Sequence, residues 1–202
     1  MDVKSQNELR IRALGLKINE CLPTIEAIQN IECRSSLEVV TRASVLSHIV
    51  GIGYGRNGLE IRAILRDQNL DQYLTPLETN FLAQTSYSDR DKAFAAWHFA
   101  AVHSLAWALK LEEMVPLKDC ADTLATHFLP KPSEHTKNAQ LRPQVELHAE
   151  ADFYYRLHWA ARDAQLYNKP FPRPMIEVEL RRKSLEWIIG KPIEWDDISL
   201  DT

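Results

Sequence analysis

The spacing of hydrophobic and polar residues along the chain is typical of helices. From Ser35 to Val50 the apolar positions follow a helical rather than an alternating spacing, as shown by Leu37, Val40, Leu46 and Val50. Ser35 and Glu38 have the spacing of a capping box, in which each end of the first turn bonds the other. The sequence therefore predicts a helix over this stretch, with Glu38 one turn before Arg42 in the favourable order for an ion pair.

Two further helix starts are equally well marked. Thr75 and Glu78 form a second capping box, and Pro76 has the backbone angle required at a first helical position. A long helix is predicted from Asp89 to Leu111, since one apolar face includes Phe94, Trp97, Ala101, Leu105 and Leu109. Other helices are expected at Glu8–Leu14, Leu59–Gln68, Lys118–Phe128, Pro143–Tyr167 and Met175–Ile189.

These elements predict a mainly α fold. Proline-rich stretches separate the helices, and only Gly15–Leu22 alternates in the manner of a strand. Because a lone strand cannot make a sheet, we expect a single compact multi-helix domain over residues 1–202 with at most a minor strand near residues 15–22.

Composition narrows the class of protein. The net charge is −4 and the basic residues are interspersed with acids, so no basic face is expected to bind nucleic acid. No apolar run approaches the ~20 residues of a membrane span or resembles a signal peptide, and we expect a cytoplasmic protein. Cys21, Cys33 and Cys120 show no C-x-x-C spacing, which favours small buried side chains in a reducing compartment over zinc ligands or disulfides.

A glycine-rich segment matches the sequence of a dinucleotide-binding motif. Residues 53–58 read G-Y-G-R-N-G, which matches G-x-G-x-x-G. That motif binds a pyrophosphate when a strand precedes it, whereas here a predicted helix does. The acid expected about 20 residues later to contact a ribose is Glu78, which already belongs to a capping box. We interpret the segment as a helix-to-helix connection that needs positive backbone angles, and we expect no cofactor.

Familiar catalytic and metal-binding patterns are missing from the sequence. His98 and His103 are five residues apart and face different directions, and no H-E-x-x-H motif occurs. No hydrolase elbow, nucleotide-binding P-loop or EF-hand pattern occurs either. No catalytic residue and no metal ligand is therefore assigned.

A set of polar residues lies on an otherwise apolar face of the predicted helix Pro143–Tyr167. At about 100° per residue, Asp152, Arg156, Trp159 and Asp163 fall on or beside the stripe that includes Val145, Ala149, Ala160 and Tyr167. Buried charges must be paired or kept for a ligand. Two interpretations stay open: a structural ion-pair network, and a binding pocket lined by Arg156, Trp159 and Asp163.

The segment W-D-D-I-S-L-D-T, residues 195–202, joins a large apolar side chain to three acids. Trp195 is suited to fill an apolar recess, and Asp196, Asp197 and Asp201 are suited to accept hydrogen bonds from Arg156, Arg181, Arg182 or helix N-termini. We expect an ordered strap folded back on the domain. The alternative is a metal site that these acids form with Asp163.

Three segments together resemble a known family. They are D-F-Y-Y-R-L-H-W-A-A-R-D-A from Asp152, R-R-K-S-L-E-W from Arg181 to Trp187, and the W-D-D segment, supported by Arg42, L-T-P-L-E from Leu74 and L-A-W-A-L from Leu105. In this order they resemble the bacterial family catalogued as domain of unknown function 4272. The resemblance implies a compact, mainly helical domain and brings no known activity. A glutamate would be expected just before Arg181, where Leu180 stands, with Glu177 or Glu179 as substitutes.

These observations favour a non-enzymatic protein that works by binding another protein, as an immunity-like or accessory factor. Arg181, Trp187 and Trp195 join the polar residues above as candidate binding residues. The alternative is a metal-assisted hydrolase that uses the clustered carboxylates. A large exposed apolar patch would favour a partner, and a closed pocket with convergent acids would favour a reaction.

Overall fold

The computed structural model describes residues 2–25, 30, 32–114, 116–118, 124–129 and 139–201. Within these residues the chain forms seven α-helices and three short 3-10 helices and no strand, which confirms the mainly α fold. The chain divides into two compact units, unit 1 with Met1–Arg34 and Arg142–Thr202 and unit 2 with Ser35–Leu141. The expectation of a single domain over the whole chain stays a prediction.

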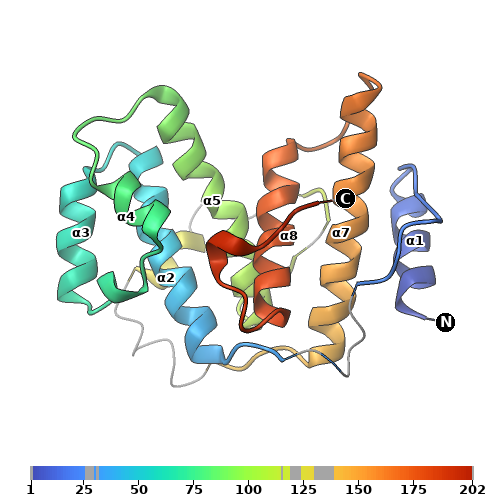
Figure 1. Cartoon of the computed structure of the whole chain (residues 1–202), viewed down its shortest axis with the longest axis horizontal. Helices are drawn as coiled ribbons and strands as arrows, with labels where there is room; N and C mark the ends of the chain where they lie inside the picture. Colours follow the sequence, from blue (N-terminus) through green and yellow to red (C-terminus); the bar gives the residue numbers. More distant parts are fainter. Residues whose placement is uncertain are drawn as a thin grey trace. The chain divides into compact units, whose positions relative to one another are not determined.

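Unit 2 is built around two long helices. Its elements are α2 (Ser36–Gly53), α3 (Gly58–Asp67), η2 (Asp71–Tyr73), α4 (Pro76–Leu82), α5 (Asp89–Ala108) and η3 (Leu124–Phe128) (Figure 1). Every residue from Val39 to Val50 is buried, as expected for a helix at the centre of a unit. α2 packs along α5, and a methyl group at Gly53 would come within 2.7 Å of the Ala96 side chain. The two backbones therefore approach closely where α2 ends.

Local signals start the helices of unit 2. Ser35, Thr75 and Ser88 each close a capping box, and the first two boxes are confirmed predictions. The predicted helix Asp89–Leu111 ends at Ala108 instead, because the chain turns through a positive φ of 60° at Lys110. The apolar face predicted for this helix is exposed at its first turns, where Phe94 is 47% exposed.

The glycine segment is a helix-to-helix connection, as predicted, with one correction. Gly51 and Gly53 lie inside α2, and Gly58 begins α3. Of the glycines from 51 to 58, Gly55 alone has a positive φ, of 86°. Asn57 then caps α3 by accepting a hydrogen bond from the Leu59 amide.

Unit 1 has three α-helices and one 3-10 helix in its described residues. They are α1 (Val3–Ala13), α7 (Gln144–Leu166), α8 (Met175–Ile189) and η4 (Trp195–Asp197), and α7 packs against both α1 and α8 (Figure 1). The predicted helices Pro143–Tyr167 and Met175–Ile189 are confirmed, with α7 one residue shorter at each end. The predicted helix at Glu8 begins earlier, at Val3, because the Asp2 side chain caps it.

Other predictions have mixed outcomes. Residues 15–22 form turns and irregular backbone, and not the minor strand that was allowed for. Of the predicted helix Lys118–Phe128, residues 119–123 lie outside the described residues, and the rest contains η3. Cys21 is exposed, so its predicted burial is wrong, and Cys33 is half-buried. Cys120 lies outside the described residues. In the described part of the chain, every helix is too short or too polar to cross a bilayer.

Candidate functional site

The predicted pair Asp152 and Arg156 forms a buried, two-pronged contact on α7. The guanidinium Nε donates to Asp152 Oδ2 at 2.8 Å and Nη2 donates to Asp152 Oδ1 at 2.9 Å. The Asp152 and Arg156 side chains are 1% and 3% exposed. Such a bidentate contact is the geometry in which arginine binds carboxylates most strongly.

Groups from α1 and the segment after it complete this contact. Asn7 donates to Asp152 Oδ2 at 2.9 Å, and Glu8 lies 3.6 Å from Arg156 Nη1. Arg156 also donates to the carbonyl oxygens of Leu22 at 3.4 Å and Pro23 at 3.1 Å. The arginine therefore joins α7 to two segments that are distant from it in the sequence.

Trp159 and Asp163 face a different part of unit 1. The Lys17 Nζ lies 2.7 Å from Asp163 Oδ1 and 5.4 Å from the centre of the Trp159 ring. The structure thus separates the predicted pocket into a buried part at Arg156 and a surface part at Lys17.

A second buried network joins α7 to α8. Glu177 lies 3.0 Å from Arg181 and accepts a hydrogen bond at 2.6 Å from Arg173. Arg181 also donates to the Tyr154 hydroxyl at 3.3 Å. Burial raises the pKa of Tyr154 to about 12, so this hydroxyl keeps its proton at neutral pH. Glu177 thus contacts two arginines, and whether it or Glu179 takes the place of the glutamate expected at Leu180 stays a prediction.

Arg182 of α8 joins its own helix to α7 and to the strap. It donates to Glu186 at 2.6 Å, to His158 Nδ1 at 2.8 Å and to the carbonyl oxygen of Leu200 at 3.0 Å. It also donates to the carbonyl oxygen of Asp201 at 3.1 Å. Burial, with the charge of Arg182 next, lowers the pKa of His158 to about 4.

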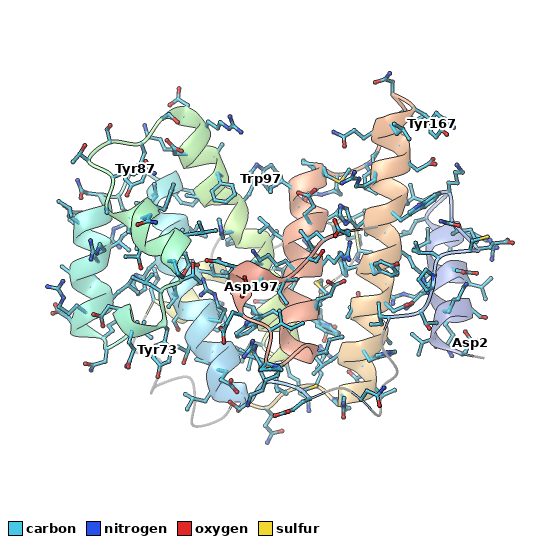
Figure 2. All side chains as sticks on the ribbon, viewed as in Figure 1. Asp2, Tyr73, Tyr87, Trp97, Tyr167 and Asp197 are labelled. Carbon is cyan, nitrogen blue, oxygen red and sulfur yellow. The ribbon has the colours of Figure 1, made fainter. Side chains whose placement is uncertain are left out.

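The described residues of the predicted strap fold back on α8, although the hydrogen bonds differ from those expected. Trp195 is 4% exposed and its ring meets that of Trp187 edge to face, with centres 5.6 Å apart. The strap's carbonyl groups, and not its carboxylates, accept the hydrogen bonds from Arg182. Asp201 accepts a hydrogen bond from Ser199, and Asp197 is exposed (Figure 2). Asp196 is half-buried.

The predicted carboxylate cluster does not form in the described residues. Asp163 contacts Lys17, while Asp197 lies on η4 beyond α8. Within the described ranges, no three His, Cys, Asp or Glu side chains gather in a way that could hold a metal ion.

Unit 2 carries a group of neighbouring aromatic side chains, of which the sequence pattern had indicated Phe94 alone, as part of an apolar helix face. The rings of Phe81 and Tyr87 have centres 5.1 Å apart, and those of Phe81 and Phe94 are 6.3 Å apart. Leu77 lies one turn before Phe81 on α4 and is 65% exposed. We call Leu77, Phe81, Tyr87 and Phe94 the aromatic surface, and Tyr87 marks its place between α4 and α5 (Figure 2).

A buried ion pair joins α2 to α4. The Arg42 guanidinium of α2 contacts the Glu78 carboxylate of α4, and the two side chains are 5% and 9% exposed. Glu78 also accepts a hydrogen bond from the Thr75 amide at 3.0 Å and so closes the capping box. One carboxylate therefore both starts α4 and fixes it to α2.

A comparison with known protein families agrees with the resemblance seen in the sequence. The family model described as Domain of unknown function (DUF4272) matches residues 3–198, nearly the whole chain. The chain belongs to the DUF4272 family. No curated protein and no solved structure matches the chain.

The segments that pointed to DUF4272 hold most of the contacts described for unit 1. Asp152 and Arg156 come from the first segment, and Arg181, Arg182 and Trp187 come from the second. Trp187 lies under the Arg34 guanidinium, 4.2 Å from the ring centre, and Trp195 packs on its edge.

Sequence reasoning missed several residues of these networks. Asn7 and Glu8 lie on α1, more than a hundred residues before Arg156, and no local pattern connects them to it. His158 and Lys17 were missed for the same reason. The i,i+4 spacing of Arg182 and Glu186 was a local signal that could have been used.

Proposed function

We propose that this member of the DUF4272 family is a non-enzymatic protein that binds another protein through the aromatic surface of unit 2. It would act as an immunity-like or accessory factor, by binding to its partner protein. The observation that carries the proposal is the contact of the half-buried Phe81 ring of α4 with the rings of Tyr87 and of the exposed Phe94 on α5, one turn after the exposed Leu77.

The exposure of this surface supports a partner. Leu77 is 65% exposed and Phe94 is 47% exposed. Adjacent exposed apolar groups are a feature of interaction sites, whereas scattered ones are ordinary. Aromatic residues are also enriched at the centres of protein interfaces, where they contribute a large contact area. Burying these side chains under a partner would therefore stabilise a complex.

The pairing of the buried charges supports a structural role for them. Asp152 holds Arg156, Glu177 holds Arg181, and Glu78 holds Arg42. A reaction that uses carboxylates needs at least one of them directed towards a substrate. The described buried carboxylates are instead directed towards arginines of the same unit.

The thiols support a cytoplasmic location for the interaction. Cys21 and Cys33 are both free. Free thiols persist in a reducing compartment.

The test is capture of a partner by matched variants. Leu77→Asp with Phe94→Asp places two charges in the aromatic surface. Val145→Asp with Leu166→Asp places two charges on exposed apolar positions of α7, which are 55% and 75% exposed, and serves as the control. Because all four side chains are exposed, both double variants should keep the melting temperature within a few degrees of the unaltered protein.

We expect the unaltered protein and the α7 control to recover the same protein from cells of the native source. The aromatic-surface variant should recover at least about tenfold less of it, as expected for a loss of about 1.4 kcal/mol or more. Quantitative mass spectrometry gives the amounts, and mixing of the purified proteins checks direct binding. Equal recovery by both double variants would reject the aromatic surface as the binding site. Concentration-dependent self-association, abolished by the same change, would identify a second copy of the chain as the partner.

A further inference from the structure

Lys17 is seated in a three-sided site on the surface of α7. Its Nζ lies 5.4 Å from the ring centre of Trp159, 5.6 Å from that of Tyr167 and 2.7 Å from Asp163 Oδ1. Both ring distances are within the ~6 Å over which a cation is attracted to an aromatic face. The ammonium group therefore meets two rings and one carboxylate at once.

The site is encoded by one stripe of α7. Trp159, Asp163 and Tyr167 are spaced four residues apart, so they follow one another along the same side of the helix. Residues eight apart are separated by about 12 Å along a helix axis. A cation near the middle of this span reaches both rings, and Asp163 lies at the middle. Tyr167 lies at the carboxyl end of α7 (Figure 2).

The exposure of the two charged partners is unequal. The Asp163 side chain is 10% exposed, whereas that of Lys17 is 58% exposed. A carboxylate that is largely removed from water needs a positive partner. The lysine, which belongs to the irregular segment 15–22, reaches the site from solvent. The receiving groups are therefore fixed on a helix, and the cation is the exposed member of the contact.

We propose that Trp159, Asp163 and Tyr167 form a binding site for an alkylammonium group, and that Lys17 occupies it as an internal ligand. The hydrogen bond to Asp163 requires an N–H donor, so the preferred ligand is a primary amine such as a lysine side chain or a small free amine. A quaternary ammonium group keeps the attraction to the two rings but loses this hydrogen bond. The site lies in unit 1 and is independent of the aromatic surface.

Because Lys17 occupies the site, an external amine must displace it in order to bind. A lysine tethered close to its site acts at a high effective concentration, on the order of millimolar or more. Removal of its ammonium group should free the Trp159 ring and the Asp163 carboxylate, while Lys169 Nζ remains 5.8 Å from the centre of the Tyr167 ring. The binding of an external amine should therefore strengthen when Lys17 is changed, which a purely structural contact would not produce.

The test uses Lys17→Met, which keeps the apolar stem and removes the charge. NMR of the Trp159 indole N–H, assigned with a Trp159→Phe variant, follows titrations of butylammonium, tetramethylammonium and a blocked lysine amide. We expect saturable shifts in Lys17→Met, at least about tenfold tighter than in the unaltered protein, with the two primary amines binding more tightly than tetramethylammonium. Adding Asp163→Asn should remove the preference for primary amines. A response to the blocked lysine and not to butylammonium would identify a protein lysine as the source, and the reverse would identify a free amine.

Two results would overturn the proposal. One is a folded Lys17→Met protein whose Trp159 signal does not respond to any of the three probes. The other is equal affinity in Lys17→Met and in the unaltered protein. If Lys17→Met does not fold, the unaltered protein can be titrated with butylammonium instead. Displacement of Lys17 should then shift the NMR signal of its ammonium group away from the ring-shielded position. An unmoved lysine signal at saturating amine would reject the site.

Discussion

His158 Nδ1 accepts a hydrogen bond from the guanidinium of Arg182 at 2.8 Å, between helices α7 and α8. An imidazole nitrogen can accept only while it carries no proton. His158 must therefore be neutral in the folded protein, with its remaining N–H on Nε2, 3.5 Å from Glu179. The contact that holds the strap at Leu200 and Asp201 depends on this protonation state, because the same guanidinium binds both carbonyl groups.

The first prediction is a loss of stability in acid that originates at His158. The unfolded residue gains a proton near pH 6.5, whereas its folded pKa is lowered to about 4 by burial and by Arg182. Between these two values the unfolded state holds more protons, so falling pH favours unfolding. The free energy of unfolding should drop by about 3 kcal/mol from this group between pH 7 and pH 4. Urea unfolding at a series of pH values from 7 to 4 measures it.

His158→Gln is the matched variant, since a glutamine oxygen can accept from Arg182 and does not titrate. Burial raises the pKa of Glu186 and of Glu150, and both carboxyl groups oppose the effect by favouring the folded state as pH falls. The comparison of slopes between the two proteins removes their contribution. An identical pH dependence in His158→Gln would show that His158 does not control acid stability.

The second prediction concerns the Asp152–Arg156 contact. Arg156→Ala should lower the free energy of unfolding by about 3 to 5 kcal/mol, because it leaves a buried carboxylate without its main partner. Arg12→Ala is the control: Arg12 pairs with Glu20, the two side chains are 45% and 75% exposed, and such surface pairs contribute at most about 1 kcal/mol. Chemical denaturation of both variants measures the two losses in free energy of unfolding. Equal costs for the two changes would mean that Arg156 does not act as a structural partner.

The third prediction concerns the strap. Trp195→Ala should cost about 3 to 5 kcal/mol, since a buried indole leaves a cavity beside Trp187. Removal of residues 195–202 should cost at least as much, because Arg182 then loses two carbonyl partners as well. Asp197→Asn, at an exposed position, should leave the melting temperature unchanged. The prediction fails if the shortened chain melts like the full one. A rise in melting temperature with a divalent cation that Asp197→Asn abolishes would favour the metal alternative.

The fourth prediction separates two roles of Glu78. Glu78 and Asp91 occupy the same capping-box position of α4 and α5, but Glu78 alone of the two contacts a buried arginine, Arg42. Asp91→Ala should cost about 1 kcal/mol, the usual value of a helix cap. Glu78→Ala should cost about 3 kcal/mol or more, because a buried charge loses its partner. Similar losses of denaturation free energy in the two variants would show that the contact with Arg42 adds little.

The helices could be predicted from sequence where their signals are local. Ser35 and Thr75 cap the predicted helices because each capping box lies within four residues. The Asp152–Arg156 contact was accessible for the same reason, as its members are one helical turn apart.

Features set by tertiary packing could not be predicted in this way. Asn7, Lys17 and His158 reach their partners only after α1, α7 and α8 pack together. Phe94 shows a different limit of sequence patterns. An apolar stripe on a helix predicts burial along its whole length, but the stripe of α5 is exposed at Phe94. The strap's carboxylates were expected to bind arginines, but the backbone carbonyl groups at Leu200 and Asp201 do so instead.

The division of unit 1 into two stretches of sequence has a consequence for its synthesis. Residues 35–141 form unit 2 and are translated between the two stretches. The capping boxes and the α2–α5 contact of unit 2 lie within this continuous stretch, so unit 2 can fold while the ribosome is still adding α7 and α8. Asn7 and Glu8 must wait for Asp152 and Arg156 to emerge, which leaves α1 without its native contacts until late in translation.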